Sequence, residues 1–147
     1  MIFEIPVPPR TKKNHSEICY NPVTKMRFIR PSKIYKDFEK ECGKYIPKKL
    51  LNAKINVPIN IKCTYYMQKR NAVDLPNLLN ATDDILVHYG VLEDDNCRII
   101  VSHDGSRVYY DKENPRTVVE ITKSQDTEFF PKVEKKPSKR AKNGSKK

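Results

Sequence analysis

Residues 69–96 read KRNAVDLPNLLNATDDILVHYGVLEDDN, and they contain the most regular pattern in the chain. The apolar positions of this stretch fall within one arc of about 120° when plotted at 100° per residue, as on the buried face of a helix. These positions are Leu75, Leu78, Leu79, Thr82, Ile85, Leu86 and Tyr89. Asp74 stands at the N-cap position, Pro76 in the first turn and Gly90 at the C-terminal end. The stretch therefore predicts a core-facing helix followed by an acidic turn at residues 93–96.

Two further segments, both before this helix in the chain, show a regular spacing of apolar residues. Ser32 is a good helix cap, and a helical spacing of apolar residues follows it until Pro47 ends the helix. The expected buried face of this helix consists of Ile34, Phe38, Cys42 and Tyr45. Apolar residues then alternate at positions 59, 61, 63 and 65, which predicts a strand over residues 57–67.

Short strands are predicted at residues 2–5, 98–102, 108–110 and 117–122, and a hairpin over 15–29 turns at Asn21-Pro22. This order of elements indicates an α+β fold. We expect one small domain over residues 1–130, with two helices packed on a mostly antiparallel or mixed sheet.

The last residues, 131–147, hold eight basic residues against one acidic residue and a single branched aliphatic side chain. Such a segment buries too little apolar surface to order itself, so we expect a disordered Lys/Arg-rich tail. The two interpretations of this tail are a solubilising extension and a non-specific DNA tether.

The composition narrows the class of partner. The chain has 147 residues, with 29 Lys and Arg against 18 Asp and Glu, and a formal net charge of +11. This excess favours a polyanionic partner, either nucleic acid or an anionic membrane surface. No apolar run approaches the length of a transmembrane helix, and the N-terminus lacks a secretory pattern. With four cysteines and no CxxC pair, we expect reduced thiols and a cytoplasmic location.

The carboxylates carry the most informative chemistry. Asp74, Asp94 and Asp95 flank the central helix, and the basic Lys69 and Arg70 precede it. Carboxylates that bind Mg²⁺ within a basic surface suit phosphodiester hydrolysis, because the metal activates water while the cations hold the backbone. Taken alone, Asp74 is better explained as a helix cap and residues 93–96 as a solvated turn.

Distance limits how these carboxylates combine. A helix of about fifteen residues rises about 23 Å, so Asp74 and Asp95 meet only if the chain turns back after Gly90. Otherwise a second chain has to complete the site.

At this point residues 69–96 resemble the signature of RusA-type Holliday junction resolvases. The matching positions are Asp74, Asn77, Leu78, Asp84, Gly90, Asp94 and Asp95. The opening IPVPPRTKKNH, together with Ser32 and Tyr35, extends the similarity over most of residues 1–122. The resemblance implies a homodimeric endonuclease that depends on Mg²⁺, with Mn²⁺ as the alternative metal. Such an enzyme cuts opposing strands of four-way DNA junctions in recombination and repair, in a bacterium or its phage.

Carried over by position, Asp74 and Asp95 are metal-binding and catalytic carboxylates. We add Asp94 to both roles and assign DNA binding to Lys69, Arg70, Asn77 and Arg107.

The sequence departs from the family pattern at two site positions. The family's second Asp falls on Pro76 and its catalytic Lys on Asn80. Asp94 is the favoured replacement for the carboxylate, ahead of Asp84 and Asp104, while the replacement for the lysine is left open among Lys69, Arg70 and Arg107.

Two rival functions follow from these departures and from the aromatic residues. The first is a DNA-binding protein on the same scaffold that lacks catalysis. The second is an RNA-binding protein whose aromatic rings stack on bases, although rings in predicted strands more often pack in the core. The rings in question are Tyr65, Tyr66, Tyr109 and Tyr110.

Overall fold

The computed structural model describes residues 1–125 of the chain. The predicted tail at 131–147 lies outside the described residues. Among residues 1–125, no helix has the length and apolar character needed to cross a membrane.

A five-stranded mixed sheet is built around β4 (Ile59–Met67). On one side, β7 (Arg116–Lys123) pairs antiparallel with β4, and β1 (Ile2–Ile5) pairs antiparallel with β7. On the other side, β5 (Ile100–Ser102) and β6 (Arg107–Tyr110) run parallel to β4, at its start and at its end respectively. The predicted α+β fold with a mixed sheet is confirmed.

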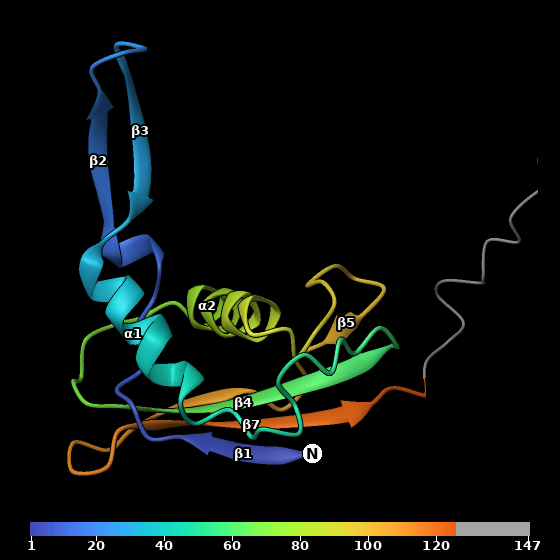
Figure 1. The fold of residues 1–147 in the computed structure, drawn as a ribbon. Coiled ribbons are helices and arrows are strands. Elements are labelled where there is room, and N and C mark those ends of the chain that lie inside the picture. The colour runs from blue at the N-terminus through green and yellow to red at the C-terminus, as the bar shows by residue number, and fades with distance from the viewer. Residues whose placement is uncertain (126–147) are drawn as a thin grey trace, which may run out of the picture.

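The two predicted helices are α1 (Lys33–Gly43) and α2 (Leu75–His88), and both cover the same face of the sheet (Figure 1). The alternation predicted for β4 places its odd-numbered side chains under these helices, where they are buried. Its even-numbered side chains point to the opposite face. The core contains Phe3, Ile59, Ile61, Cys63, Tyr65, Leu78, Ile85, Leu86, Val119 and Ile121.

The buried face of α1 differs from the prediction. Ser32 caps the helix as expected, since its Oγ accepts a hydrogen bond from the Tyr35 N–H at 3.3 Å. However, Ile34 is 56% exposed, and Tyr35 is buried in its place. The rings of Tyr35 and Phe38 pack with their centroids 5.8 Å apart. Phe38 and Cys42 are buried as predicted, but Tyr45 is 41% exposed and Ile46 is buried instead. The prediction is therefore wrong at both ends of the face, by one residue each.

Helix α2 buries its stripe as predicted, and it ends where the sequence indicates. Gly90 has a φ of +68°, and the N–H groups of Val91 and Leu92 both donate to the Leu86 carbonyl. These bonds turn the chain back at the end of the helix. Asp83, which is not part of the predicted stripe, is also buried.

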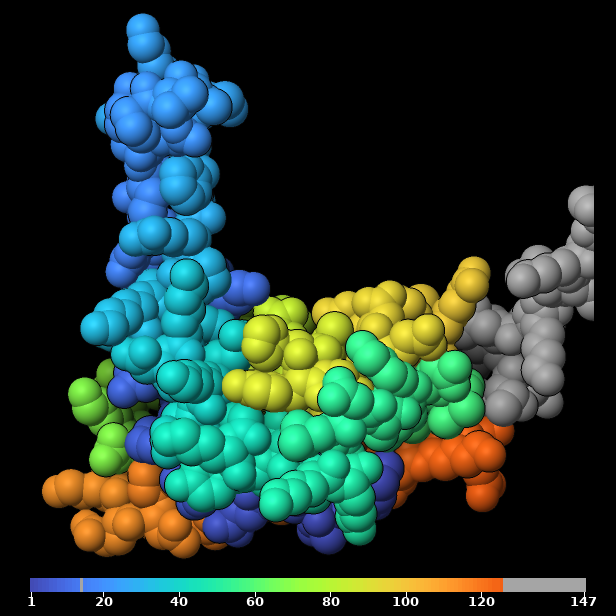
Figure 2. Space-filling view, in the orientation of Figure 1, coloured from blue at the N-terminus to red at the C-terminus, as the bar shows by residue number. Residues whose placement is uncertain are grey.

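Strands β2 (Ser16–Asn21) and β3 (Met26–Pro31) follow the short 3₁₀ helix η1 (Lys13–His15) and form a separate hairpin. We call residues 16–31 the arm. The arm extends away from the body of the domain (Figures 1 and 2). Its exposed large side chains are Ile18, Tyr20, Val23, Met26, Phe28 and Ile29. A lone two-stranded hairpin is only marginally stable in water, so this surface is a candidate contact surface.

Candidate active site

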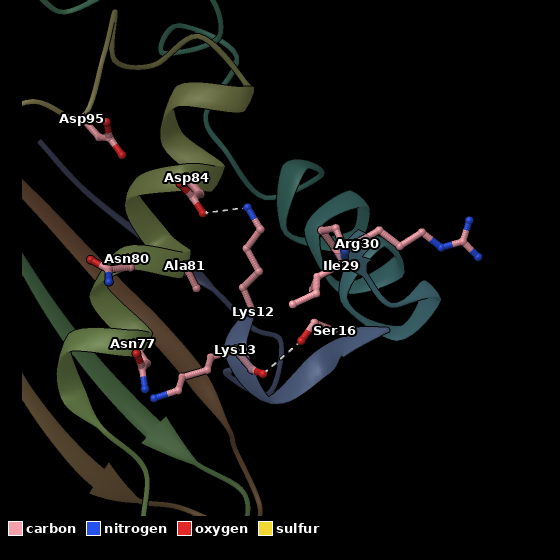
Figure 3. Close-up of a pocket in the computed structure, with 11 residues that line it drawn as sticks. Lys12, Lys13, Ser16, Ile29, Arg30, Asn77, Asn80, Ala81, Asp84 and Asp95 are labelled. Carbon is pink, nitrogen blue, oxygen red and sulfur yellow. Dashed lines mark hydrogen bonds and ion pairs between the residues drawn. The ribbon is translucent and has the colours of Figure 1, made fainter. Parts of the chain in front are cut away.

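A cavity of about 510 Å³ lies between the base of the arm and α2 (Figure 3). Asn77, Asn80, Ala81 and Asp84 line it from α2, and Asp95 lines it from the acidic turn. The facing wall is formed by Lys12, Lys13, Ser16, Ile29, Arg30 and Pro31. The cavity therefore brings two carboxylates and the ammonium groups of Lys12 and Lys13 into one space, whereas the Arg30 guanidinium points away from it and lies 3.4 Å from Glu17 (Figure 3).

Asp84 and Asp95 are the carboxylates of this cavity. Asp84 lies on the side of α2 that faces away from the core, as its position in the helical pattern predicts. The Lys12 Nζ atom is 3.3 Å from its Oδ2 (Figure 3), and both side chains are well exposed. Water screens such a pair, so it fixes the position of the two groups more than it adds stability.

Asp94 is occupied in shaping the turn that carries Asp95. Its Oδ1 accepts a hydrogen bond from the Asp95 N–H at 2.9 Å, and its Oδ2 accepts one from the Asn96 side chain. The Asn96 bond, followed by the backbone bond, lowers the pKa of Asp94. Asp94 does not line the cavity. Its observed contacts hold Asp95 in place.

Asp74 stands at the N-cap position of α2, but its side chain makes no hydrogen bond to the helix backbone. Instead, its Oδ2 accepts a bond from Asn77 Nδ2 at 3.0 Å. Ten residues of helix separate Asp74 from Asp84, a rise of about 15 Å. Asp74 does not line the cavity and is connected to it through Asn77, which does. Asp95 lines the cavity together with Asp84.

The predicted cationic residues lie elsewhere. Lys69 lines a second, smaller cavity of about 270 Å³, together with Arg10 and His15. The guanidinium of Arg70 packs 4.0 Å from the centre of the Tyr110 ring, and Arg107 lies exposed on β6 at the sheet edge. None of the three lines the cavity with the carboxylates.

Lys12 and Lys13 supply the positive charge there, and sequence reasoning missed them. The run Arg10-Thr11-Lys12-Lys13 is the only local signal, since no pattern within it indicates that it folds against α2.

The oxygen-rich lining suits a hard divalent cation. Asp84, Asp95, Asn77 and Asn80 offer carboxylate and carboxamide oxygens, the ligand type that Mg²⁺ prefers. Within residues 1–125, however, no group of three or more His, Cys, Asp or Glu side chains gathers into a metal site. The ligand chemistry fits a metal, and a single chain contributes two carboxylates to the cavity.

Next to Asp84 on α2, the buried Asp83 forms a pair with the half-buried His103 that the sequence does not indicate. His103 Nδ1 is 2.9 Å from the Ile61 carbonyl oxygen, which only accepts, so Nδ1 carries a proton. Its Nε2 is 3.0 Å from Asp83 Oδ2. Burial raises the pKa of Asp83, and the His103 bond partly offsets that effect. This pair joins α2 to the segment after β5.

The fold and cavity together define a class: a small α+β protein that sets carboxylates among cations, as the handling of a phosphate backbone requires. Residues 6–122 match the family described as Endodeoxyribonuclease RusA. The match covers well over half of the chain, which therefore belongs to the RusA endodeoxyribonuclease family. Membership implies the nuclease activity of Holliday junction resolvases, and nucleases of this family generally depend on a divalent metal. No curated protein sequence matches the chain.

Proposed function

We propose that this chain is a Mg²⁺-dependent, structure-selective endodeoxyribonuclease that resolves four-way DNA junctions by paired symmetric nicks. The observation that carries the proposal is the cavity in which Asp84 and Asp95 face Lys12 and Lys13. Carboxylates alone would repel a phosphate, whereas cations alone would bind it without activating water. Both kinds of group in one cavity suit hydrolysis of a phosphodiester. The proposed setting is recombination and repair in the cytoplasm of a bacterial or phage-infected cell.

Asp95 and Asp84, with the carboxamide oxygens of Asn77 and Asn80, are the residues that would hold Mg²⁺, or Mn²⁺ in its place. Asp74 supports this set by holding the side chain of Asn77, and Asp94 supports Asp95 by fixing the turn. When bound, the metal supplies Lewis-acid polarisation of the phosphate and a more acidic water. The family has a catalytic lysine at the position of Asn80. In this chain Lys12 takes the role of that lysine.

The remaining cations serve DNA binding. Lys13 lines the cavity, Arg30 lies beside it on the arm, and Lys69 and Arg70 lie on the segment that leads to Asp74. Arg107 adds charge at the sheet edge. Because phosphate contacts position a protein without reading bases, the proposed enzyme recognises the shape and backbone of the junction first.

The proposed active form is a homodimer. Two cuts in strands of like polarity need two sites in matching orientation, which a two-fold dimer provides. The arm offers an exposed apolar surface for such a contact, with Ile18 and Ile29 paired across its strands and 75% and 74% exposed. A second copy is also a source of the further carboxylate that one chain lacks.

A single assay tests the proposal. The full chain is incubated with a mobile four-way junction, a duplex and a single-stranded RNA, first with Mg²⁺ and then with EDTA. We expect cleavage of the junction alone, loss of cutting in EDTA, and no cutting by Asp95→Asn. Glu93→Gln is the matched control, because it removes a neighbouring exposed carboxylate that does not line the cavity.

The same assay separates a second candidate, a DNA-binding protein without catalysis. The observation that favours it is that, within residues 1–125, only two carboxylates line the cavity and no third one joins them to form a metal site. Junction binding with no cleavage under Mg²⁺ or Mn²⁺ would establish this candidate, and it would reject the nuclease.

A further inference from the structure

Strand β6 exposes aromatic side chains at the edge of the sheet. All four of its residues, Arg107–Tyr110, are exposed. Tyr109 is 49% exposed and Tyr110 is 40% exposed. Successive side chains of a strand point to opposite faces, so the edge presents one ring on each face of the sheet. Neither ring belongs to the core, where Tyr65 is buried instead.

Tyr109 ends a row of flat groups that crosses three strands. Arg116 on β7 pairs with Tyr66 on β4, and Tyr66 pairs with Tyr109 on β6. The Arg116 guanidinium lies 3.6 Å from the centre of the Tyr66 ring. Tyr66 in turn stacks on Tyr109, with the ring centroids 5.5 Å apart and the planes 24° from parallel. The row lies on the face of the sheet opposite the helices, and its outermost ring is Tyr109.

Tyr110 is held beside the segment that leads to the candidate active site. The Asp111 N–H donates to the Met67 carbonyl at 2.9 Å, which keeps the end of β6 against the end of β4. Arg70, three residues beyond Met67, covers the Tyr110 ring at 4.0 Å. Asp74 and the start of α2 follow four residues later. The aromatic edge therefore lies beside the segment that leads into the first turn of α2.

The charge at this edge favours a polyanion. Within residues 1–125, neither Arg70 nor Arg107 has a carboxylate within ion-pair distance. The nearby acid, Asp111, is occupied, because its Oδ2 lies 3.0 Å from Arg116 Nη1. Two unpaired guanidinium groups thus flank two exposed rings. Rings that stack bases, set beside cations that meet phosphates, are the recurring composition of single-strand binding surfaces.

We propose that the β6 edge, with Tyr109 and Tyr110 between Arg70 and Arg107, stacks unpaired bases of a DNA strand at the branch point of the junction. The inference rests on the proposed function, since it names the part of the DNA that the enzyme holds beside its active site. Paired bases in a duplex already stack on both of their faces. An aromatic edge therefore selects bases that a branch point or single strand has released, and it does so with little regard to sequence.

The test uses the full chain with Tyr109→Leu, Tyr110→Leu and Tyr109→Phe. Binding of a fluorescent deoxythymidine dodecamer is measured over a series of salt concentrations. Each leucine variant should weaken binding about tenfold, whereas Tyr109→Phe should bind like the original chain because it keeps the ring. The slope of affinity against salt should not change, since no charge is removed. Tyr45→Leu, at a 41% exposed ring remote from this edge in the sequence, is the matched control.

A second readout identifies the contact directly. A dodecamer carrying 5-iododeoxyuridine is photo-cross-linked to the chain, and the modified peptide is identified by mass spectrometry. Cross-links at Tyr109 or Tyr110 support the proposal. Unchanged affinity in both leucine variants, or cross-links only at other residues, would overturn it.

Parallel experiments distinguish failure of this inference from failure of the proposed function. Junction binding and cleavage with Mg²⁺ are followed for the same variants, together with thermal unfolding and molar mass. A chain that binds the dodecamer through Tyr109 but never cuts a junction would reject the nuclease and retain the stacking site. A change in molar mass in Tyr109→Leu, with dodecamer binding intact, would show instead that the edge joins two copies of the chain.

Discussion

His103 Nε2 lies 3.0 Å from Asp83 Oδ2, and this contact links the segment after β5 to the middle of α2. Burial by itself would lower the pKa of His103, but the hydrogen bond and charge of Asp83 outweigh it and raise that pKa. The Asp83 pKa is also raised, chiefly by burial. The Oδ1 atom of Asp83 has no hydrogen-bond partner among residues 1–125. The folded pair therefore holds protons more strongly than the same groups in the unfolded chain.

The first prediction concerns stability against pH. Because both pKa values are raised on folding, the contribution of His103 is complete below its unfolded value near 6.5 and is lost as pH rises through its folded value. The contribution of Asp83 to stability is complete below its unfolded pKa of 3.8 and is lost as pH rises through its raised folded pKa. We expect the free energy of unfolding, measured with urea in EDTA, to fall from mildly acidic to mildly alkaline pH.

His103→Gln should flatten this dependence and cost about 1–3 kcal/mol at mildly acidic pH, because it weakens the one side-chain hydrogen bond that residues 1–125 provide to the buried Asp83 carboxylate. His88→Gln is the control, since His88 is exposed and its contact with Glu39 is long, at 3.8 Å. An unchanged pH dependence in His103→Gln would show that the pair does not titrate with folding.

Much of the fold was predictable because its patterns are local. The apolar stripe of α2 and the alternation of β4 each lie within one continuous segment, and both are observed. The face of α1 was predicted correctly at Phe38 and Cys42 but wrongly at its start, since the choice between Ile34 and Tyr35 depends on what the sheet below can accommodate. The burial of Asp83 was not predictable, because its partner His103 is twenty residues away and enters only through the packing of β5 under α2.

The candidate site was predicted less completely than the fold. The acidic turn that carries Asp95 is evident in the sequence, but the observed cavity pairs Asp95 with Asp84 rather than with Asp94. The cations facing them come from the base of the arm, some seventy residues earlier in the chain. No periodicity connects segments so far apart, and the position of Lys12 depends on how the hairpin leaves the body.

The second prediction concerns Asp74. If it takes part in metal binding, Asp74→Asn should abolish junction cleavage while binding survives or tightens, because repulsion of the phosphates is reduced. Its effect on stability should stay within about 0.5 kcal/mol, since the side chain makes no capping bond to the helix backbone. Cleavage rates and urea denaturation of the purified variant measure both effects. Full cleavage by Asp74→Asn would remove Asp74 from the site and leave Asp84 and Asp95.

The third prediction concerns the basic C-terminal residues. Deletion of 131–147 removes eight basic residues and one acidic residue, a net charge of +7. Affinity for any DNA should fall, and the slope of log affinity against log salt should become less steep. The preference for a junction over a duplex should persist, because we assign it to the folded domain. Fluorescence anisotropy with both DNA forms over a salt series checks this, and an identical slope would show that these residues do not contact DNA.

The fourth prediction concerns the arm as the contact between two copies of the chain. Ile18 lies on β2 and is 75% exposed, so a charge there should leave the fold intact and break an apolar interface. Light scattering at several dilutions should give twice the 17.2 kDa chain mass for the original protein and a single chain mass for Ile18→Lys.

Ile34→Lys tests α1 as the competing contact surface, and Ile2→Lys on β1 is the control for adding a charge at an exposed isoleucine. Function is followed on a supercoiled plasmid that extrudes a cruciform. A dimer makes both cuts before it dissociates, so the original chain should linearise the plasmid with little nicked intermediate, whereas Ile18→Lys should release mainly nicked circles. If Ile18→Lys stays dimeric and Ile34→Lys becomes monomeric, α1 and not the arm joins the two copies. An original chain that is monomeric at every dilution, and that only nicks the plasmid, would instead indicate a general structure-specific nickase.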